Sequence, residues 1–118
     1  MYVLLAEDNL LNQKVMVLML KKMGHRVDLA YNGLDVLRYM ESSCYDVILM
    51  DIHMPGMDGI TATKEVRRRW PLGPKIIAVT TYDRAGGREM CLEAGMDDFL
   101  SKPAKIEDLR AALKRVLP

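Results

Sequence analysis

Acidic residues directly follow two apolar segments of this chain. Glu7 and Asp8 come after Val3–Ala6, and Asp51 comes after Asp46–Met50. Three carboxylates brought together repel one another unless a cation lies between them. Carboxylate oxygens suit Mg²⁺, which typically binds one or two of them together with phosphate oxygens and water. The sequence therefore predicts a Mg²⁺ site at these residues, with Mn²⁺ as an alternative ion.

Two more side chains at comparable places can act on a phosphoryl group. Thr80 ends the apolar segment Lys75–Thr80 and offers a hydroxyl as a hydrogen-bond donor. Lys102 offers a mobile positive charge for a phosphoryl oxygen. Asp51 can serve both as a metal ligand and as a nucleophile, because a coordinated metal aligns an incoming phosphoryl group and neutralises its charge. Together these residues indicate phosphoryl transfer onto Asp51.

Each of these residues, taken alone, has a simpler structural explanation. Asp8 can be the N-cap of a helix, and Lys102 can be a solvated loop charge. Thr80 can be an ordinary β-branched strand residue. The convergence of all of them on one end of a sheet is instead typical of a functional site, so we interpret them as one set.

Apolar runs and turn signals predict strands that alternate with helices. The expected strands are Val3–Ala6, Arg26–Tyr31, Asp46–Met50, Lys75–Thr80 and Asp97–Leu100. The expected helices are the segment from Asn9 to Met23, then Leu34–Glu41, Ile60–Trp70, Arg84–Ala94 and Ile106–Leu117. This alternation indicates an α/β fold with a parallel sheet covered on both faces. Right-handed crossovers favour the flavodoxin-like, doubly wound order 2-1-3-4-5, with a ligand site beyond the carboxyl ends of the first and third strands.

Charge and composition limit the classes of partner and location. The chain suits one compact domain, 1–118, and its net charge of +1 gives no nucleic-acid or membrane footprint. The basic run Arg67–Arg69 is interpreted as a solvated helix end. No apolar stretch reaches the roughly 20 residues of a membrane span, and we expect no signal peptide because Met1–Tyr2 run straight into an apolar strand. Cys44 and Cys91 match no metal-ligand spacing and are expected to be free thiols of a cytoplasmic protein.

Four motifs in combination resemble the receiver domains of response regulators in two-component signalling. They are AEDN at 6–9, DIHMPGMDG at 51–59, KIIAVT ending at Thr80, and the pair Lys102–Pro103. The resemblance covers essentially the whole chain. It implies that Asp51 is the phosphoacceptor and that Glu7 and Asp8 are the acidic metal pair.

The same resemblance assigns roles to further residues. His53 matches the position that lends its backbone carbonyl to the metal, and its imidazole is not expected to bind because Mg²⁺ favours oxygen ligands. Thr80 resembles the switch hydroxyl. Lys102 resembles the phosphoryl-binding lysine, with a cis peptide before Pro103. Phe99 occupies the position of the aromatic residue that turns inward on activation.

The patterns EDN-x-x-NQKV and MPGMDG resemble receivers attached to hybrid sensor histidine kinases. The chain is then expected to be part of such a kinase or a stand-alone regulator, as a monomer or weak dimer. It would not be an enzyme beyond catalysing its own phosphorylation and dephosphorylation. Two residues depart from the family pattern, Thr81 where a small residue is usual and the bulky Tyr82. Both bear on how long a phosphoryl group would persist.

The first helix carries a second pattern. Val15, Met16, Met19, Leu20 and Met23 form a stripe at helical spacing that predicts the core face. Leu11, Lys14 and Leu18 are left on the other side. In the family this face docks the phosphohistidine donor, which is a sensor histidine kinase or a histidine phosphotransfer domain. An apolar patch rimmed by charge suits such a transient interface. The alternative is that the two leucines are scattered surface residues.

Three other functions compete with the receiver interpretation. An aspartyl-nucleophile phosphatase would also pair a strand-end Asp with Mg²⁺, but it needs a positioned acid two residues later, where this chain has His53. A flavodoxin-like cofactor binder would present amides and hydroxyls to phosphate, and Glu7 and Asp8 would repel it. A receiver that only docks, without phosphorylation, has no need of the complete site.

Overall fold

Five parallel strands form one sheet in the computed structural model, which describes residues 1–80 and 87–116. The strands are β1 (Tyr2–Ala6), β2 (Arg26–Ala30), β3 (Val47–Met50), β4 (Lys75–Thr80) and β5 (Asp98–Ser101). The helices are α1 (Leu10–Lys22), α2 (Gly33–Ser42), α3 (Gly59–Arg69), α4 (Gly87–Ala94) and α5 (Ile106–Val116). The order β2-β1-β3-β4-β5, with every neighbouring pair parallel, confirms the flavodoxin-like fold predicted from the sequence.

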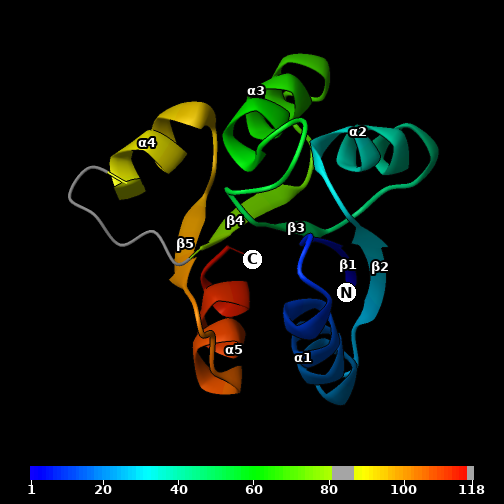
Figure 1. Ribbon diagram of the computed structural model, residues 1–118, viewed down its shortest axis with the longest axis vertical. Helices are drawn as coiled ribbons and strands as arrows, with labels where there is room; N and C mark the ends of the chain where they lie inside the picture. Colours follow the sequence, from blue (N-terminus) through cyan, green and yellow to red (C-terminus); the bar gives the residue numbers. More distant parts are fainter. Residues whose placement is uncertain (81–86, 117–118) are drawn as a thin grey trace.

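Helices cover both faces of the sheet (Figure 1). α1 and α5 lie on one face, and α2, α3 and α4 lie on the other. Leu20 and Leu109 belong to the buried cluster on the first face, and Leu37 and Val66 belong to the cluster on the second. Because both faces are covered, the inner strands are apolar along their length, and all of Val47–Met50 is buried.

Side-chain caps fix where three of the helices begin. The side chain of Asn9 accepts a hydrogen bond from the backbone N–H of Asn12 at 3.0 Å. Asn32 and Asp58 cap α2 and α3 in the same way. Such a cap satisfies a backbone N–H that the first turn of a helix leaves unpaired. Asn9 therefore takes the capping position of α1, and Asp8 is not a helix cap.

The core face of α1 differs from the stripe predicted from the sequence. Met16 and Leu20 are buried as expected, but Val15 is 46% exposed. The predicted stripe left out Gln13, which is polar, and Gln13 is buried. Gln13, Met16 and Leu20 define the inward face at the spacing i, i+3 and i+7, so Val15 is turned away from the core.

The basic run Arg67–Arg69 is only partly solvated, which differs from the prediction, because Arg67 is partly buried. Its guanidinium donates to the carbonyl of Gly95 at 2.9 Å and to the carbonyl of Pro74 at 2.8 Å. It also pairs with the carboxylate of Asp97 at 2.8 Å. The two arginines that follow it are exposed, as expected. Arg67 thus ties α3 to the segments that precede β4 and β5.

Some element boundaries differ from the sequence prediction by a few residues. The fifth strand begins at Asp98 rather than Asp97, and the carboxylate of Asp97 accepts hydrogen bonds from Arg67 and from the backbone N–H of Ile76. The predicted helix start at Arg84 and the predicted end at Leu117 lie outside the described residues. None of the helices within residues 1–80 and 87–116 is long and apolar enough to cross a membrane.

Candidate functional site

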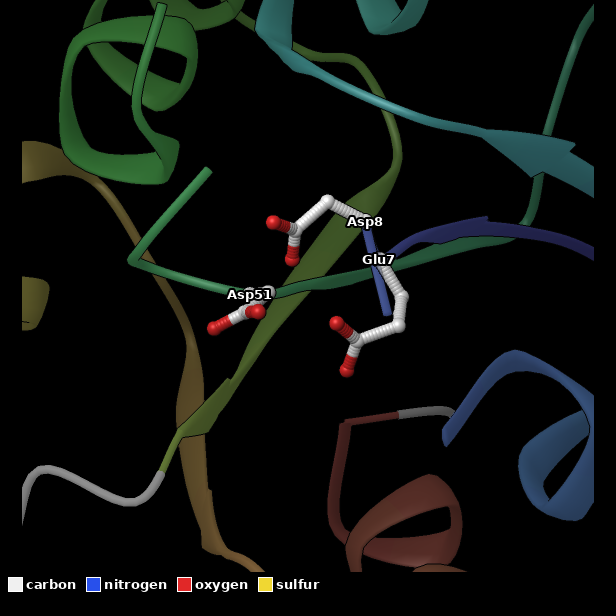
Figure 2. A group of neighbouring side chains, drawn as sticks. All are labelled: Glu7, Asp8 and Asp51. Carbon is white, nitrogen blue, oxygen red and sulfur yellow. The ribbon is translucent and has the colours of Figure 1, made fainter. Parts of the chain in front are cut away.

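Three carboxylates converge where β1 and β3 end. Glu7 and Asp8 follow β1 and Asp51 follows β3, and these strands are neighbours in the sheet. One oxygen from each side chain lies within 4.8 Å of the other two, and Figure 2 shows the carboxylates around a shared space. Glu7 and Asp51 are buried, whereas Asp8 is exposed. A set of hard oxygen ligands at this spacing, open to solvent on one side, fits a small divalent cation.

The ammonium group of Lys102 reaches into this acidic cluster. Its Nζ donates to Asp51 Oδ2 at 3.1 Å and also to Glu7 Oε1. Burial alone would lower the pKa of Lys102, but the hydrogen bond to Glu7 and the charge of Asp51 outweigh burial and raise that pKa above its ordinary value. Lys102 therefore stays positively charged and partly neutralises the buried carboxylates. The sequence predicted its nearness to Asp51, but not its ion pair with Glu7.

Hydrogen bonds in and around the turn between β1 and α1 hold Glu7 in place. The N–H of Glu7 donates to the carbonyl of Ala30 at 3.0 Å, and its carbonyl accepts from the side-chain amide of Gln13 at 2.5 Å. The N–H of Asn9 donates to Glu7 Oε2 at 3.1 Å. Glu7 is thus fixed by β2, by α1 and by its own turn.

Asp51 is held by the sheet on one side and by the start of α3 on the other. Its N–H donates to the carbonyl of Ala6 at 3.0 Å, and Gly59 N–H donates to the carbonyl of Ile52 at 2.9 Å. A Cβ added at Gly59 would lie 2.0 Å from the carbonyl oxygen of Asp51, so only glycine permits this approach. His53 is exposed, and its backbone N–H donates to Asp51 Oδ1 at 3.3 Å.

Thr80 and Phe99 lie on the neighbouring strands β4 and β5. Thr80 is fully buried at the end of β4 and pairs in register with Ser101. Its carbonyl accepts a hydrogen bond from the N–H of Lys102 at 2.9 Å. Phe99 is half-buried against the cluster under α2, α3 and α4. The peptide bond between Lys102 and Pro103 is cis, as the family resemblance implied. Thr81 and Tyr82 lie outside the described residues.

The residues predicted to dock a phosphate donor line two grooves rather than one. Leu11 lines a groove of about 200 Å³ next to the site, together with Val15, Lys102 and other residues. Lys14 and Leu18 line a separate groove of about 470 Å³ between α1 and β2. Leu11 and Leu18 are both strongly exposed. Of these two grooves, the groove of Leu11 includes Lys102, whose ammonium donates to the carboxylates of Glu7 and Asp51.

The alternating fold and the acidic cluster at the carboxyl ends of β1 and β3 agree with one family of proteins. The family model described as "Response regulator receiver domain" matches residues 3–114. The chain is a receiver domain. Receiver domains belong to two-component signalling, so the resemblance noted in the sequence motifs is confirmed.

Relatives of this receiver domain include much longer proteins. It is 45% identical over 121 residues to hybrid signal transduction histidine kinase M of Dictyostelium discoideum, covering 98% of this chain and 5% of that protein. This receiver domain spans 5% to 15% of the length of the first curated relatives it matches.

Solved structures agree with the fold of this receiver domain. The receiver domain of sensor histidine kinase PA1611 from Pseudomonas aeruginosa is 43% identical, with a TM-score of 0.86 and coverage of 98% of this chain and 95% of that one. That receiver has a magnesium ion coordinated in its active site cleft. Chemotaxis protein CheY4 of Vibrio cholerae is 28% identical, with a TM-score of 0.91 and 98% coverage of both chains.

Two residues that shape the site of this receiver domain were not singled out from the sequence. Gln13 holds the backbone of Glu7, and Gly59 permits the close approach to Asp51. The signal for Gln13 was a polar residue at the helical spacing of the core face. Gly59 lies in a turn-rich loop, where glycine is common, so its type alone does not reveal a tight contact.

Proposed function

We propose that this receiver domain accepts a phosphoryl group on Asp51 from a phosphohistidine donor, in a reaction that requires Mg²⁺. The observation that carries the proposal is the convergence of Glu7, Asp8 and Asp51, with Lys102 bonded to two of them. Convergent charged groups at the carboxyl ends of parallel strands are typical of a reactive site. Mn²⁺ can replace Mg²⁺ in this proposal, since both are divalent cations that oxygen ligands suit.

The proposed reaction moves one phosphoryl group between two proteins. A carboxylate oxygen of Asp51 attacks the phosphorus of the donor's phosphohistidine. The new O–P bond forms as the N–P bond breaks, and the bonding electrons return to the imidazole nitrogen of the donor. Bound Mg²⁺ supplies positive charge that offsets the charge of the phosphoryl oxygens.

Residues of this chain hold the metal and the transferred group in this proposal. Glu7, Asp8 and Asp51 would hold the ion through their carboxylates, and His53 would contribute its backbone carbonyl. Lys102 exchanges its bond to Glu7 for one to a phosphoryl oxygen, since its ammonium already lies 3.1 Å from Asp51 Oδ2. A charge-assisted hydrogen bond of this kind is stronger than a neutral one.

The phosphate donor is proposed to dock in the groove beside Lys102. Leu11 and Val15 of α1 supply exposed apolar surface there, and an apolar contact flanked by charge suits a transient partner. Leu18 and Lys14, which line the other groove, form an outer part of the same docking face. The donor is a sensor histidine kinase or a histidine phosphotransfer domain.

After phosphorylation, Thr80 and Phe99 are proposed to carry the change to the surface. Thr80 is buried at the carboxyl end of β4. Asp51 and Lys102 follow the carboxyl ends of β3 and β5, on the same side of the sheet. The hydroxyl of Thr80 donates to a phosphoryl oxygen, and the half-buried Phe99 turns into the space that Thr80 leaves. The surface formed by α4, β5 and α5 then differs between the two states, because the phosphoryl group makes contacts in only one of them.

The wider setting is part of the same proposal. The chain acts as one domain over residues 1–118, within a hybrid histidine kinase or as a single-domain regulator, and it turns over no substrate beyond its own phosphoryl group. It acts as a monomer or weak dimer in the cytoplasm, without contact to nucleic acid or membrane. Cys44 and Cys91 are both free, and Cys44 is exposed, which suits a reducing compartment.

Intact mass after incubation with Mg²⁺ and a small phosphodonor tests the function. Wild type should gain one phosphoryl group, Asp51→Asn should gain none, and chelation of Mg²⁺ should prevent the gain. An unphosphorylated docking module would gain nothing under any condition. Sustained hydrolysis of several phosphomonoesters would instead support an aspartyl-nucleophile phosphatase.

A further inference from the structure

The buried side-chain amide of Gln13 links α1 to the turn that carries Glu7 and Asp8. Its residue is 3% exposed, and its Nε2 donates to the carbonyl oxygen of Glu7 at 2.5 Å. A polar side chain costs free energy when it is buried, unless a hydrogen bond compensates. The other two buried residues of α1, Met16 and Leu20, are apolar. Gln13 differs from them in its hydrogen bond to Glu7.

This hydrogen bond fixes the peptide that links the two acidic residues. The carbonyl of Glu7 and the N–H of Asp8 belong to the same planar peptide unit. The N–H of Glu7 is already bonded to Ala30, so Gln13 completes the hold on the backbone of Glu7. Gln13 therefore contacts the peptide unit from which the chain continues into Asp8.

The position of the Asp8 carboxylate depends on the backbone conformation more than the position of the Glu7 carboxylate does. The carboxylate of Glu7 is held by the N–H of Asn9 and by Lys102. The carboxylate of Asp8 accepts no hydrogen bond from the described residues, and it is exposed. Its place within 4.8 Å of the other two ligand oxygens therefore follows from the conformation of the turn.

We propose that Gln13 is a positioning residue for the divalent-cation site, acting through the Glu7 carbonyl to aim the carboxylate of Asp8. This inference rests on the proposed function, because it assumes that the acidic cluster binds the cation. Residues that orient metal ligands from outside the coordination sphere change affinity by roughly 10- to 100-fold when they are lost. Gln13→Met keeps the length of the side chain and removes the donor, so it should weaken Mg²⁺ binding by about 10-fold or more.

The experiment titrates the full chain with Mg²⁺. The backbone amide NMR signals of Asp8 and Asp51 measure binding at each Mg²⁺ concentration. Wild type, Gln13→Met and Asp8→Asn are compared with Leu20→Val. Leu20 is fully buried on the same face of α1 and is absent from the acidic turn, so its variant reports the effect of lost packing alone. Gln13→Asn serves as a second variant if Gln13→Met does not fold, since its amide is one methylene too short to reach the carbonyl.

The expected pattern is weaker Mg²⁺ binding in the Gln13 variant and in Asp8→Asn, with wild-type affinity in Leu20→Val. The amide signal of Asp8 should also shift in the Gln13 variant before any Mg²⁺ is added. Affinity within about 2-fold of wild type in the Gln13 variant, with a clear loss in Asp8→Asn, overturns the role of Gln13 and leaves the metal site intact. Equal weakening in Leu20→Val overturns it as well. Absence of binding in wild type itself overturns the metal site and this inference together.

Discussion

Gly59 approaches Asp51 so closely that a Cβ at Gly59 would lie 2.0 Å from the carbonyl oxygen of Asp51. The obstacle is backbone rather than a flexible side chain, so the start of α3 and the end of β3 would have to separate. Gly59→Ala should therefore lower the free energy of unfolding by roughly 1–3 kcal/mol, as overpacking does. It should also slow phosphorylation of Asp51 by a small phosphodonor.

Gly24→Ala is the matched control for Gly59→Ala. Gly24 has a φ of +87°, and a Cβ there would meet no atom within 4 Å. Its variant suffers backbone strain without a collision near Asp51. Denaturant unfolding and intact-mass time courses compare the two proteins. A Gly59→Ala protein that is phosphorylated at the wild-type rate would show that the contact does not position Asp51.

Mg²⁺ should stabilise the folded domain by mass action, because the three carboxylates come together only in the folded chain. At a Mg²⁺ concentration of about ten times Kd, the gain is roughly 1.4 kcal/mol. For a domain of this size that corresponds to a rise in Tm of roughly 5 °C. Asp8→Asn should show a smaller rise. Identical melting curves with and without millimolar Mg²⁺, in both proteins, would contradict the proposed metal site.

Leu11→Asp should slow phosphoryl transfer from a phosphohistidine protein while sparing phosphorylation by a small phosphodonor. Leu11 lines the groove that contains Lys102, so a charge there meets the partner close to the reacting atoms. Leu18→Asp should have a smaller effect, since Leu18 lines the other groove. Leu72→Asp is the control, because Leu72 is fully exposed and precedes the opposite end of β4. Stopped-flow transfer rates test this order, and equal slowing with both kinds of donor would mean that Leu11 supports the fold instead.

Thr80→Ala should still accept a phosphoryl group on Asp51 but should fail to transmit it. The phosphoryl mimic beryllofluoride with Mg²⁺ should shift the amide NMR signals of Phe99 and α4 in wild type. Those shifts should be largely lost in Thr80→Ala, because in the proposed switch the hydroxyl provides the contact that differs between the two states. Wild-type shifts in the variant would exclude Thr80 as the switch, without affecting the role of Asp51.

Tyr45 should make the domain less stable at alkaline pH. Burial and then the hydrogen bond to Asp28, at 2.7 Å, raise the pKa of Tyr45 far above its ordinary value of 10.0. Its stabilising effect is complete below pH 10 and is lost as pH rises further, because the unfolded chain releases the proton while the folded one keeps it. This group can remove up to roughly 1.4 kcal/mol of the free energy of unfolding per pH unit above that point.

Denaturant unfolding at about pH 9 and pH 11 compares wild type with Tyr45→Phe. The variant should lose less stability over this range than wild type does. Tyr31→Phe is the control, since Tyr31 is exposed and its hydroxyl makes no hydrogen bond with the described residues. A wild-type pH dependence in Tyr45→Phe would assign the alkaline loss to other groups.

Local patterns in the sequence predicted the fold and the placement of Glu7, Asp8 and Asp51. Strand ends can be located from apolar runs, and parallel strands bring their carboxyl ends to one edge. The rest depended on contacts that local patterns do not encode. The direction of Leu11 and Leu18 around α1 decides which groove each one lines, and one groove is completed by β4 and by the segment at Lys102.

The ion pair of Lys102 with Glu7 joins residues that are 95 positions apart in the chain. Bringing such distant positions together costs more conformational entropy than a local contact does, since a longer loop must be closed. β1 and β3 can bring the acidic residues together earlier, because they are direct neighbours in the sheet. A chain that stops before β5 would therefore carry the acidic cluster without its internal cation. In the proposed reaction, the positive charge that Lys102 brings to Asp51 is therefore available only once the fifth strand has joined the sheet, so a half-folded copy would be a poorer acceptor of the phosphoryl group.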